Sequence, residues 1–334
     1  MIRVGILGAG TMAAVHAQAW QAAGATVTGV WSHSEANLAQ WAAQLGVRPF
    51  PNVDSLCAEV DLIDICTPSD SHHTYALQAA RAGRHVVCEK PIALTLRDAQ
   101  SMIQACRAAG VELFVAHVAR FYPEYRAAQA VLASGEIGDL SVLRLRSTSS
   151  VPSKSHDNWY LDPARSGGLL LDLMIHDFDT ALWLGGPVER ISARAVQPHR
   201  PDWAGDYALV TLRFASGAVA QLEGGWIYPQ GVFRTSIDIA GTAGLVEYHS
   251  DQAVTLRAFP RTAPMAAPAD EVALGLPTLA DDPFALQCRH ILAVLAGREA
   301  AFLRPEDALA ALRLALAARS SLEQGEPVRL AEWA

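Results

Sequence analysis

The sequence predicts an α/β protein of two domains: the first has a parallel sheet with crossover helices, and the second has an antiparallel sheet. Three observations predict this class. The chain begins with a strand, a glycine-rich turn and a helix. Strand and helix patterns then alternate through the first third of the chain, which is typical of a parallel sheet. From Leu140 the pattern changes to the two-residue alternation of strands with one buried face.

The first strand, expected near residues 2–7, runs directly into Gly8-Ala9-Gly10-Thr11-Met12-Ala13. Gly8 allows a tight turn, Gly10 lets the backbone approach a pyrophosphate, and Ala13 permits close packing of helix on strand. The helix N-terminus supplies amide donors and a positive dipole. This predicts a Rossmann dinucleotide site, although an ordinary strand-to-helix turn is the alternative. The expected contacts of the turn are Gly8, Gly10, Thr11 and Met12.

The remaining elements follow in order along the chain. Further strands of the parallel sheet are expected at 26–31, 62–66, 85–88 and 112–116, with helices that include 71–82 and 95–109. Gly83 and Gly110 have the position of helix C-caps. Strands of the second sheet begin near 140 and recur near 190, 207, 219, 233 and 245, before a helical tail over 283–322. We place the domains at 1–120 and 121–334.

Composition limits the class of protein. The 334 residues are 51% hydrophobic and 18% charged, which predicts a soluble globular chain with a large core. A net charge of −8 without a long basic run argues against nucleic acid as a partner. No apolar stretch approaches the roughly 18 residues that span a bilayer, and the N-terminus does not resemble a secretion leader, so we expect a cytoplasmic protein. The five cysteines lack a CxxC pair, which predicts buried free thiols, no disulfide framework and no metal.

Two successive predicted strands end in residues that could carry chemistry, Thr67-Pro68 and Glu89-Lys90-Pro91. Ligands of doubly wound folds bind at the carboxyl ends of the strands. Lys90 could therefore direct its ammonium group to a substrate oxygen and stabilise negative charge there, whereas a solvated loop lysine is the alternative. His72 and Glu89 either contact the cofactor or only cap a helix and accept loop hydrogen bonds.

A third segment, residues 167–179, reads as a glycine-opened helix with an apolar face. Asp172 and His176 are four residues apart, which places them on one face of such a helix. There the carboxylate can orient the imidazole and stabilise its protonated form, as an acid/base pair requires. The alternatives are a structural hydrogen bond and a metal site that includes Asp179, a residue for which we expect a structural role.

The chain resembles the Gfo/Idh/MocA oxidoreductases, which include glucose-fructose oxidoreductase and inositol dehydrogenase, over nearly its whole length. The residues that carry the resemblance are Gly8-Ala9-Gly10, Thr67-Pro68 with His72, residues 82–86 before Glu89-Lys90-Pro91, and Gly167-Gly168 with Asp172 and His176. The resemblance implies a Rossmann domain followed by an α/β domain with a large, open sheet. In the family that sheet commonly makes subunit contacts, so a homodimer or homotetramer is expected.

The resemblance also implies hydride transfer between a nicotinamide and a secondary alcohol or carbonyl of a sugar, cyclic polyol or related small molecule. The nicotinamide would sit between Lys90 and the helix that bears His176. Lys90 would polarise the reacting oxygen, His176 would exchange its proton, and Asp172 would hold the imidazole. The sequence departs from the family in having Leu173-Met174-Ile175 where relatives often place a glycine, which puts the local pocket shape in doubt.

Other residues are candidates for lining the substrate cleft. His117, Arg120 and Tyr122 follow the last predicted strand of the parallel sheet and match a family stretch that lines the cleft. Hinge packing between domains is the alternative for all three. Trp159, with Tyr160 beside it, could stack on a sugar ring or belong to the core.

The end of the second strand bears on the choice of cofactor. An acidic residue there would bind the ribose hydroxyls and disfavour a 2′-phosphate. The segment Val30-Trp31-Ser32-His33-Ser34 has none, and the first carboxylate is Glu35. We therefore expect NADP rather than NAD, with Ser32 and His33 as contacts.

Two other functions fit the same family. Some relatives bind the dinucleotide without turnover and act as regulators through a protein partner, and others are glycosidases that oxidise their substrate only transiently with a tightly held NAD. A regulator need not keep Lys90 and His176 together, so the presence of both favours the dehydrogenase.

Overall fold

The computed structural model describes residues 1–153, 157–196, 207–252, 256–260, 270–272 and 282–333. The chain forms two compact units. The first unit comprises Met1–Phe121 together with the segment that contains α10 (Pro283–Leu295) and ends at Leu309, and the second begins at Tyr122. The sequence predicts that every residue after 120 belongs to the second domain. The structure instead places α10 with the first unit, because this helix packs on α1 (Thr11–Ala22).

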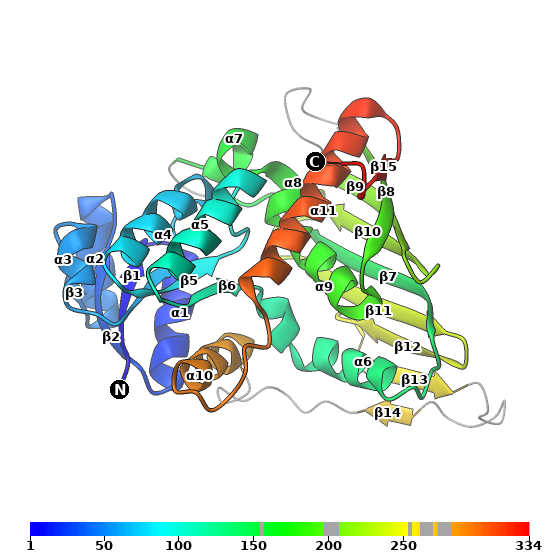
Figure 1. Cartoon of the computed structure of the whole chain (residues 1–334), viewed down its shortest axis with the longest axis horizontal. Coiled ribbons are helices and arrows are strands. Elements are labelled where there is room, and N and C mark those ends of the chain that lie inside the picture. Colours follow the sequence, from blue (N-terminus) through cyan, green and yellow to red (C-terminus); the bar gives the residue numbers. More distant parts are fainter. Residues whose placement is uncertain (154–156, 197–206, 253–255, 261–269, 273–281, 334) are drawn as a thin grey trace. The chain divides into compact units, whose positions relative to one another are not determined.

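The first unit is built on a six-stranded parallel sheet (Figure 1). Its strands are β1 (Arg3–Leu7), β2 (Thr26–Trp31), β3 (Arg48–Pro49), β4 (Leu62–Ile65), β5 (His85–Glu89) and β6 (Leu113–Ala116). The spatial order β3-β2-β1-β4-β5-β6 reverses between β1 and β4. Doubly wound folds bind dinucleotides at that reversal, beyond the carboxyl ends of the strands. The predicted Rossmann fold is confirmed.

Helices connect these strands. Besides α1 and α10 they are α2 (Glu35–Leu45), α3 (Val53–Cys57), α4 (His72–Arg81), α5 (Leu96–Ala108) and the 3₁₀ turns η1 (Ser69–Ser71) and η2 (Val118–Phe121). Local signals set several ends: the Thr95 side chain accepts a hydrogen bond from the Asp98 amide and so caps α5. The C-caps of α4 and α5 are Ala82 and Ala109, and the glycines predicted as caps, Gly83 and Gly110, follow them directly with φ of +68° and +67°, as is common just after a helix.

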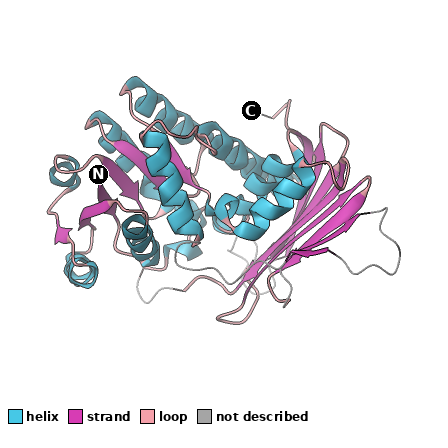
Figure 2. Ribbon diagram, turned by 90° about the horizontal axis from the view of Figure 1, so that it is seen from below, coloured by secondary structure: helices cyan, strands magenta, loops and turns pink. Residues whose placement is uncertain are grey.

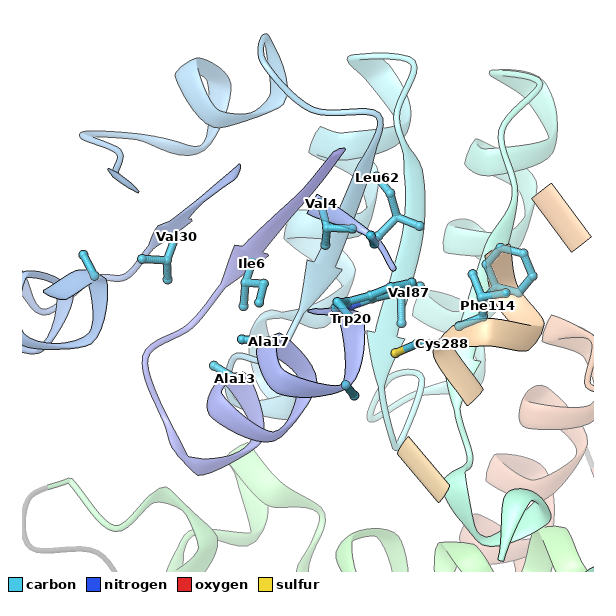
Figure 3. Close-up of a cluster of buried hydrophobic side chains, with 14 residues drawn as sticks. Val4, Ile6, Ala13, Ala17, Trp20, Val30, Leu62, Val87, Phe114 and Cys288 are labelled. Carbon is cyan, nitrogen blue, oxygen red and sulfur yellow. The ribbon is translucent and has the colours of Figure 1, made fainter. Parts of the chain in front are cut away.

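The core of the first unit gathers around Trp20, whose side chain is fully buried. Val4, Ala17 and Val87 belong to the same cluster, and Cys288 joins it from α10 (Figure 3). The small residues of α1 let this helix lie close against the sheet. Because α10 completes this core, the carboxyl-terminal half of the chain contributes directly to the nucleotide-binding unit.

The second unit is built on a nine-stranded sheet in the order β14-β13-β12-β11-β7-β10-β9-β8-β15. The strands are β7 (Leu140–Ser149), β8 (Val188–Val196), β9 (Tyr207–Phe214), β10 (Val219–Gly225), β11 (Phe233–Gly241), β12 (Gly244–His249), β13 (Leu256–Pro260), β14 (Asp270–Val272) and β15 (Val328–Arg329). The pair β7 and β10 is parallel, and the other pairs are antiparallel. The predicted, mostly antiparallel sheet is confirmed.

One face of this sheet is covered by helices (Figure 2). They are α6 (Pro123–Ala133), α8 (Gly168–Asp172), α9 (Ile175–Gly185) and the part of α11 (Pro305–Gln324) that begins at Ala310. On β9 the burial alternates strictly, and Leu209 belongs to its exposed side. Among the described residues, no helix is long and apolar enough to cross a membrane.

Candidate active site

The glycine-rich turn has the geometry that a dinucleotide needs. Gly8 has φ +114°, and a Cβ there would lie 2.5 Å from the Cys66 carbonyl oxygen, so β1 and the end of β4 approach closely only because position 8 is glycine. Gly10 is the N-cap of α1, and a Cβ built on it meets nothing within 4 Å. The protein thus leaves space at a helix N-terminus, which fits a pyrophosphate. Thr11 and Met12 form the first turn of α1 beside this space.

The end of β2 carries an aromatic cluster. The Tyr75 hydroxyl lies 2.5 Å from Nε2 of His33, and the Trp31 ring meets the His33 ring edge-on with centroids 4.6 Å apart. His33 is exposed, while Ser32 accepts a hydrogen bond from the Ser34 amide at 3.4 Å. Tyr75 could not be placed in this cluster from the sequence, because it comes from α4 and reaches His33 only through the order of the strands.

The ends of β4 and β5 are linked through His72. Its ring is buried, with Nδ1 2.9 Å from the Pro91 carbonyl oxygen and Nε2 3.0 Å from the Thr67 carbonyl oxygen. The neutral ring donates to one of these oxygens, and the protonated ring donates to both. Both nitrogens therefore face the backbone, which supports the loop hydrogen-bonding alternative for His72. Thr67 also accepts a hydrogen bond from the Ser71 hydroxyl at 2.7 Å.

A cluster of buried charged side chains lies beneath Lys90. His16 of α1 places Nδ1 2.9 Å from the Asp64 carboxylate and Nε2 2.9 Å from Oε1 of Glu89. The contact with Glu89 is an ion pair whose geometry is bent away from a linear hydrogen bond. The indole N–H of Trp20 donates to Asp64 at 2.6 Å. The imidazole thus lies between two carboxylates in the interior of the first unit.

The cluster shifts the protonation of its members. Burial is the largest single influence and disfavours the protonated form of His16, but Asp64 and Cys66 together outweigh it and hold the pKa of His16 well above its usual value. Burial alone would raise the pKa of Glu89, yet His16, followed by Lys90 and His72, lowers it below the usual value. A charged imidazolium between two carboxylates is therefore the stable state.

Possible metal-ligand atoms of His16, Asp64 and Cys66 all lie within 4.8 Å of one another. Among the described residues, these three side chains form a candidate metal-binding cluster. The Asp64 carboxylate already accepts hydrogen bonds from the Trp20 indole and the His16 ring. Burial, followed by the charge of Asp64, raises the pKa of the Cys66 thiol to about 12, which keeps the sulfur protonated. The arrangement fits a hydrogen-bonded network.

The contact between His16 and Asp64 was likewise not predicted from the sequence. The signal was present at Asp64, a single carboxylate within the otherwise apolar strand Leu62–Ile65, all of which is buried. A buried aspartate requires a donor or a cation. Which residue supplies it could not be read from the chain, because His16 is 48 residues away.

In the second unit the structure corrects the predicted helix over 167–179. Asp172 is the last residue of α8, and His176 is the second residue of α9. The amides of Leu173 and Met174 both donate to the Leu169 carbonyl, which ends α8 before α9 begins. The two residues therefore do not share one regular helix, although Leu173 and Met174 keep right-handed helical backbone angles between them. Asp172 is buried and His176 half-buried.

Two aspartates of α9, Asp177 and Asp179, are buried in the interior. The Ser147 hydroxyl of β7 donates to Oδ1 of Asp177 at 2.8 Å. Burial raises the pKa of Asp177 to about 7, against the lowering effect of Ser147. Asp179 is fully buried, and its structural role stays a prediction.

The remaining candidates lie in different units. His117 and Arg120 belong to the first unit; both are buried, and the Arg120 guanidinium is 4.0 Å from Asp307. Tyr122 begins the second unit as the N-cap of α6. Trp159 is buried and stacks on Tyr160 with ring centroids 4.0 Å apart. Their contact with a substrate stays a prediction.

The strand order, the open turn at Gly10 and the lysine at the end of β5 define a dinucleotide-binding α/β protein. Residues 2–117 match the model of the Gfo/Idh/MocA oxidoreductase family, described as an NAD-binding Rossmann fold, and residues 125–247 match the Gfo/Idh/MocA C-terminal domain. The chain belongs to the Gfo/Idh/MocA oxidoreductase family.

Individual relatives agree with this membership. The chain is 32% identical to 1,5-anhydro-D-fructose reductase of Ensifer adhaerens over 255 residues, which are 73% of this chain and 74% of the relative. It is 31% identical to inositol 2-dehydrogenase of Rhizobium meliloti over 263 residues, 76% of this chain and 78% of the relative. The crystal structure of GenD2 from gentamicin A biosynthesis in complex with NAD superposes with a TM-score of 0.86 at 26% identity, over 98% of this chain and 96% of that one.

Proposed function

We propose that this protein is an NAD(P)-dependent dehydrogenase or reductase that acts on a secondary alcohol or carbonyl of a sugar, cyclic polyol or related small molecule. The observation that carries the proposal is the combination of an open pyrophosphate turn at Gly10 with Lys90 at the carboxyl end of β5, in a chain that also has Asp172 and His176. The relatives named above act on an anhydro-sugar and on inositol, which supports this substrate class.

Each proposed catalytic residue has one task. Lys90 donates a hydrogen bond to the reacting oxygen and stabilises negative charge on it. His176 accepts the hydroxyl proton during oxidation and returns it during reduction. Asp172 stabilises the protonated imidazole of His176. The turn at Gly8 and Gly10 would hold the pyrophosphate of the dinucleotide, whose nicotinamide would supply the hydride chemistry.

A spectrophotometric screen tests the proposal directly. Purified protein is mixed with NAD⁺ or NADP⁺ and a panel of sugars, inositols and sugar acids, or with NADH or NADPH and the matching carbonyl compounds. We expect formation or loss of reduced nicotinamide with one class of substrate, and no such change with Lys90→Ala. Tight dinucleotide binding with no turnover on the panel would favour the regulator, and cleavage of a glycoside without net reduction of the cofactor would favour the glycosidase.

We further propose that NADP is preferred over NAD. Ser32 and His33 stand where an acidic residue would bind the ribose, and the Tyr75 hydroxyl lies 2.5 Å from Nε2 of His33. A hydroxyl and an imidazole tolerate a 2′-phosphate that a carboxylate would repel. Fluorescence titrations with NADPH and NADH test this, with His33→Asp as the variant that should shift the preference towards NADH. Tighter binding of NADH by the unaltered protein would contradict it.

We also propose a cytoplasmic homodimer or homotetramer that associates through the uncovered face of the nine-stranded sheet. On that face β9 and β10 expose Leu209 and Val219, which are 42% and 37% exposed and lie among polar neighbours. Light scattering after size-exclusion chromatography would report the mass of the assembly. The double variant Leu209→Lys with Val219→Lys should lower that mass to one chain, and an unchanged mass would exclude this face.

A further inference from the structure

Lys90 is bracketed by two residues that are each bonded to a buried histidine. On one side, Oε2 of Glu89 accepts a hydrogen bond from the backbone amide of Lys90 at 3.1 Å, and Oε1 of the same carboxylate pairs with His16. On the other side, the carbonyl of Pro91 lies 2.9 Å from the His72 ring. Both histidine side chains are about 1% exposed. The segment Glu89-Lys90-Pro91 is therefore held by one histidine of α1 and one of α4.

The contact through His16 is the more strongly anchored of the two. The ring is fixed at Nδ1 by Asp64, which is itself held by the indole of Trp20. His16 also faces Cys66, and on α10 it faces Phe284 at a ring distance of 5.9 Å and the thiol of Cys288. Because Cys288 belongs to the core and Cys66 and Phe284 pack against it, the imidazole can adopt few other positions. The Glu89 carboxylate therefore meets a cation of fixed position.

We propose that His16 and His72 are positioning residues for Lys90, His16 acting through the Glu89 carboxylate and His72 through the Pro91 carbonyl. This inference rests on the proposed function, in which Lys90 contacts the reacting oxygen. Neither ring is placed to touch that oxygen, since both are buried and their nitrogens face groups of the protein itself. Their effect is to fix the backbone from which the lysine side chain extends.

A network of this kind affects the rate more than the affinity. A misplacement of a catalytic group by about 1 Å lowers the rate on the order of 100-fold. Cofactor affinity depends mainly on the turn at Gly8 and Gly10, which lies at the end of β1 and takes no hydrogen bond from His16 or His72 among the described residues. Loss of either histidine should therefore lower kcat and leave the dissociation constant of the dinucleotide unchanged.

The sequence offers an unusually direct probe, because it contains two lysines, Lys90 and Lys154. Protein labelled with ¹³C at the lysine Cε gives two signals, and Lys154→Arg identifies the one from Lys90. This spectrum reports the surroundings of Lys90 without substrate or cofactor. It therefore separates the positioning of Lys90 from any question about the reaction.

The experiment compares His16→Gln and His72→Asn with His85→Gln. His85 is a matched control because it lies on the same strand as Glu89, at the opposite end, where its ring accepts a hydrogen bond from the Glu112 amide. We expect the first two variants to shift or broaden the Lys90 signal and to lower kcat on the order of 10- to 100-fold. The control should change neither. Glu89→Gln serves as an isosteric second variant if His16→Gln does not fold.

Each outcome decides the matter. An unmoved Lys90 signal in both histidine variants, or in Glu89→Gln where His16→Gln does not fold, overturns the proposal even if kcat falls. A moved signal together with lower kcat and unchanged dinucleotide affinity supports it. If the signal moves but the unaltered protein turns over no substrate, the positioning of Lys90 stands and the proposed function fails.

Discussion

The two units each place a proposed catalytic residue next to a buried carboxyl group, but they treat that carboxyl group differently. In the first unit Glu89 precedes Lys90 and is paired with His16. In the second unit Asp177 follows His176 and is bonded to the neutral hydroxyl of Ser147. Accordingly, the pKa of Glu89 is lowered by His16 despite burial, and that of Asp177 is raised by burial to about 7. The partner, rather than the depth of burial, decides whether a buried acid is charged.

The largest expected effect comes from removing the proposed catalytic residue of either unit. Lys90→Ala removes the group that stabilises the reacting oxygen, and His176→Ala removes the group that exchanges its proton. Each should lower kcat on the order of 10²- to 10⁴-fold with dinucleotide affinity retained, as measured by steady-state kinetics and fluorescence titration. A loss of cofactor binding in place of the rate would refute the assignment.

The next prediction tests the charged network of the first unit. His16→Ala would leave the carboxylates of Asp64 and Glu89 buried without their shared cation. Such a loss costs about 3 to 5 kcal/mol of unfolding free energy. Urea unfolding should show it, with His85→Ala as the control of the same residue type. A loss below about 1 kcal/mol would mean that the carboxylates find other partners or take up protons at little cost.

Asp177 should make the stability of the second unit depend on pH, because its pKa is raised in the folded protein, whereas that of Glu89 is lowered. Folding raises its pKa from about 3.9 to about 7, so the folded state binds more protons between these values. Its contribution to stability is complete below about pH 4 and is lost as the pH rises to about 7, by about 1.4 kcal/mol per pH unit. Unfolding measured across this range should lose that slope in Asp177→Asn.

Ser147→Ala sharpens the same test. The Ser147 hydroxyl lowers the pKa of Asp177, so its removal should extend the loss of stability to higher pH. If the slope were the same in the unaltered protein, Asp177→Asn and Ser147→Ala, another group would be responsible for it.

The smallest expected effect concerns the turn at Gly8 and Gly10 in the first unit, where we propose that the dinucleotide binds. Gly10→Val adds a side chain whose Cβ meets no protein atom within 4 Å, so the fold should persist while dinucleotide affinity falls at least about tenfold, or about 1.4 kcal/mol. Gly8→Ala is the contrasting variant, because its Cβ would lie 2.5 Å from the Cys66 carbonyl oxygen and should impair folding itself. Unchanged dinucleotide affinity in Gly10→Val would place the pyrophosphate elsewhere.

The sequence by itself determined the features that depend on neighbours along the chain. The turn at Gly8 and Gly10, the strand and helix alternation and the position of Lys90 after a buried strand were all readable, because turn geometry and periodicity are local properties. The antiparallel character of the second sheet was readable for the same reason. Gly83 and Gly110 were identified correctly as the glycines that end two helices, although they lie one residue after the C-caps Ala82 and Ala109.

Tertiary structure alone decided how distant residues meet. The pairing of His16 with Asp64 and Glu89 joins α1 to residues of β4 and β5, strands that the spatial order places on the other side of β1 from β2. The break between Asp172 and His176 and the packing of α10 on α1 are likewise visible only in the folded structure. Spacing along the chain does not encode which buried charge finds which partner, because that choice minimises the free energy of the whole folded core.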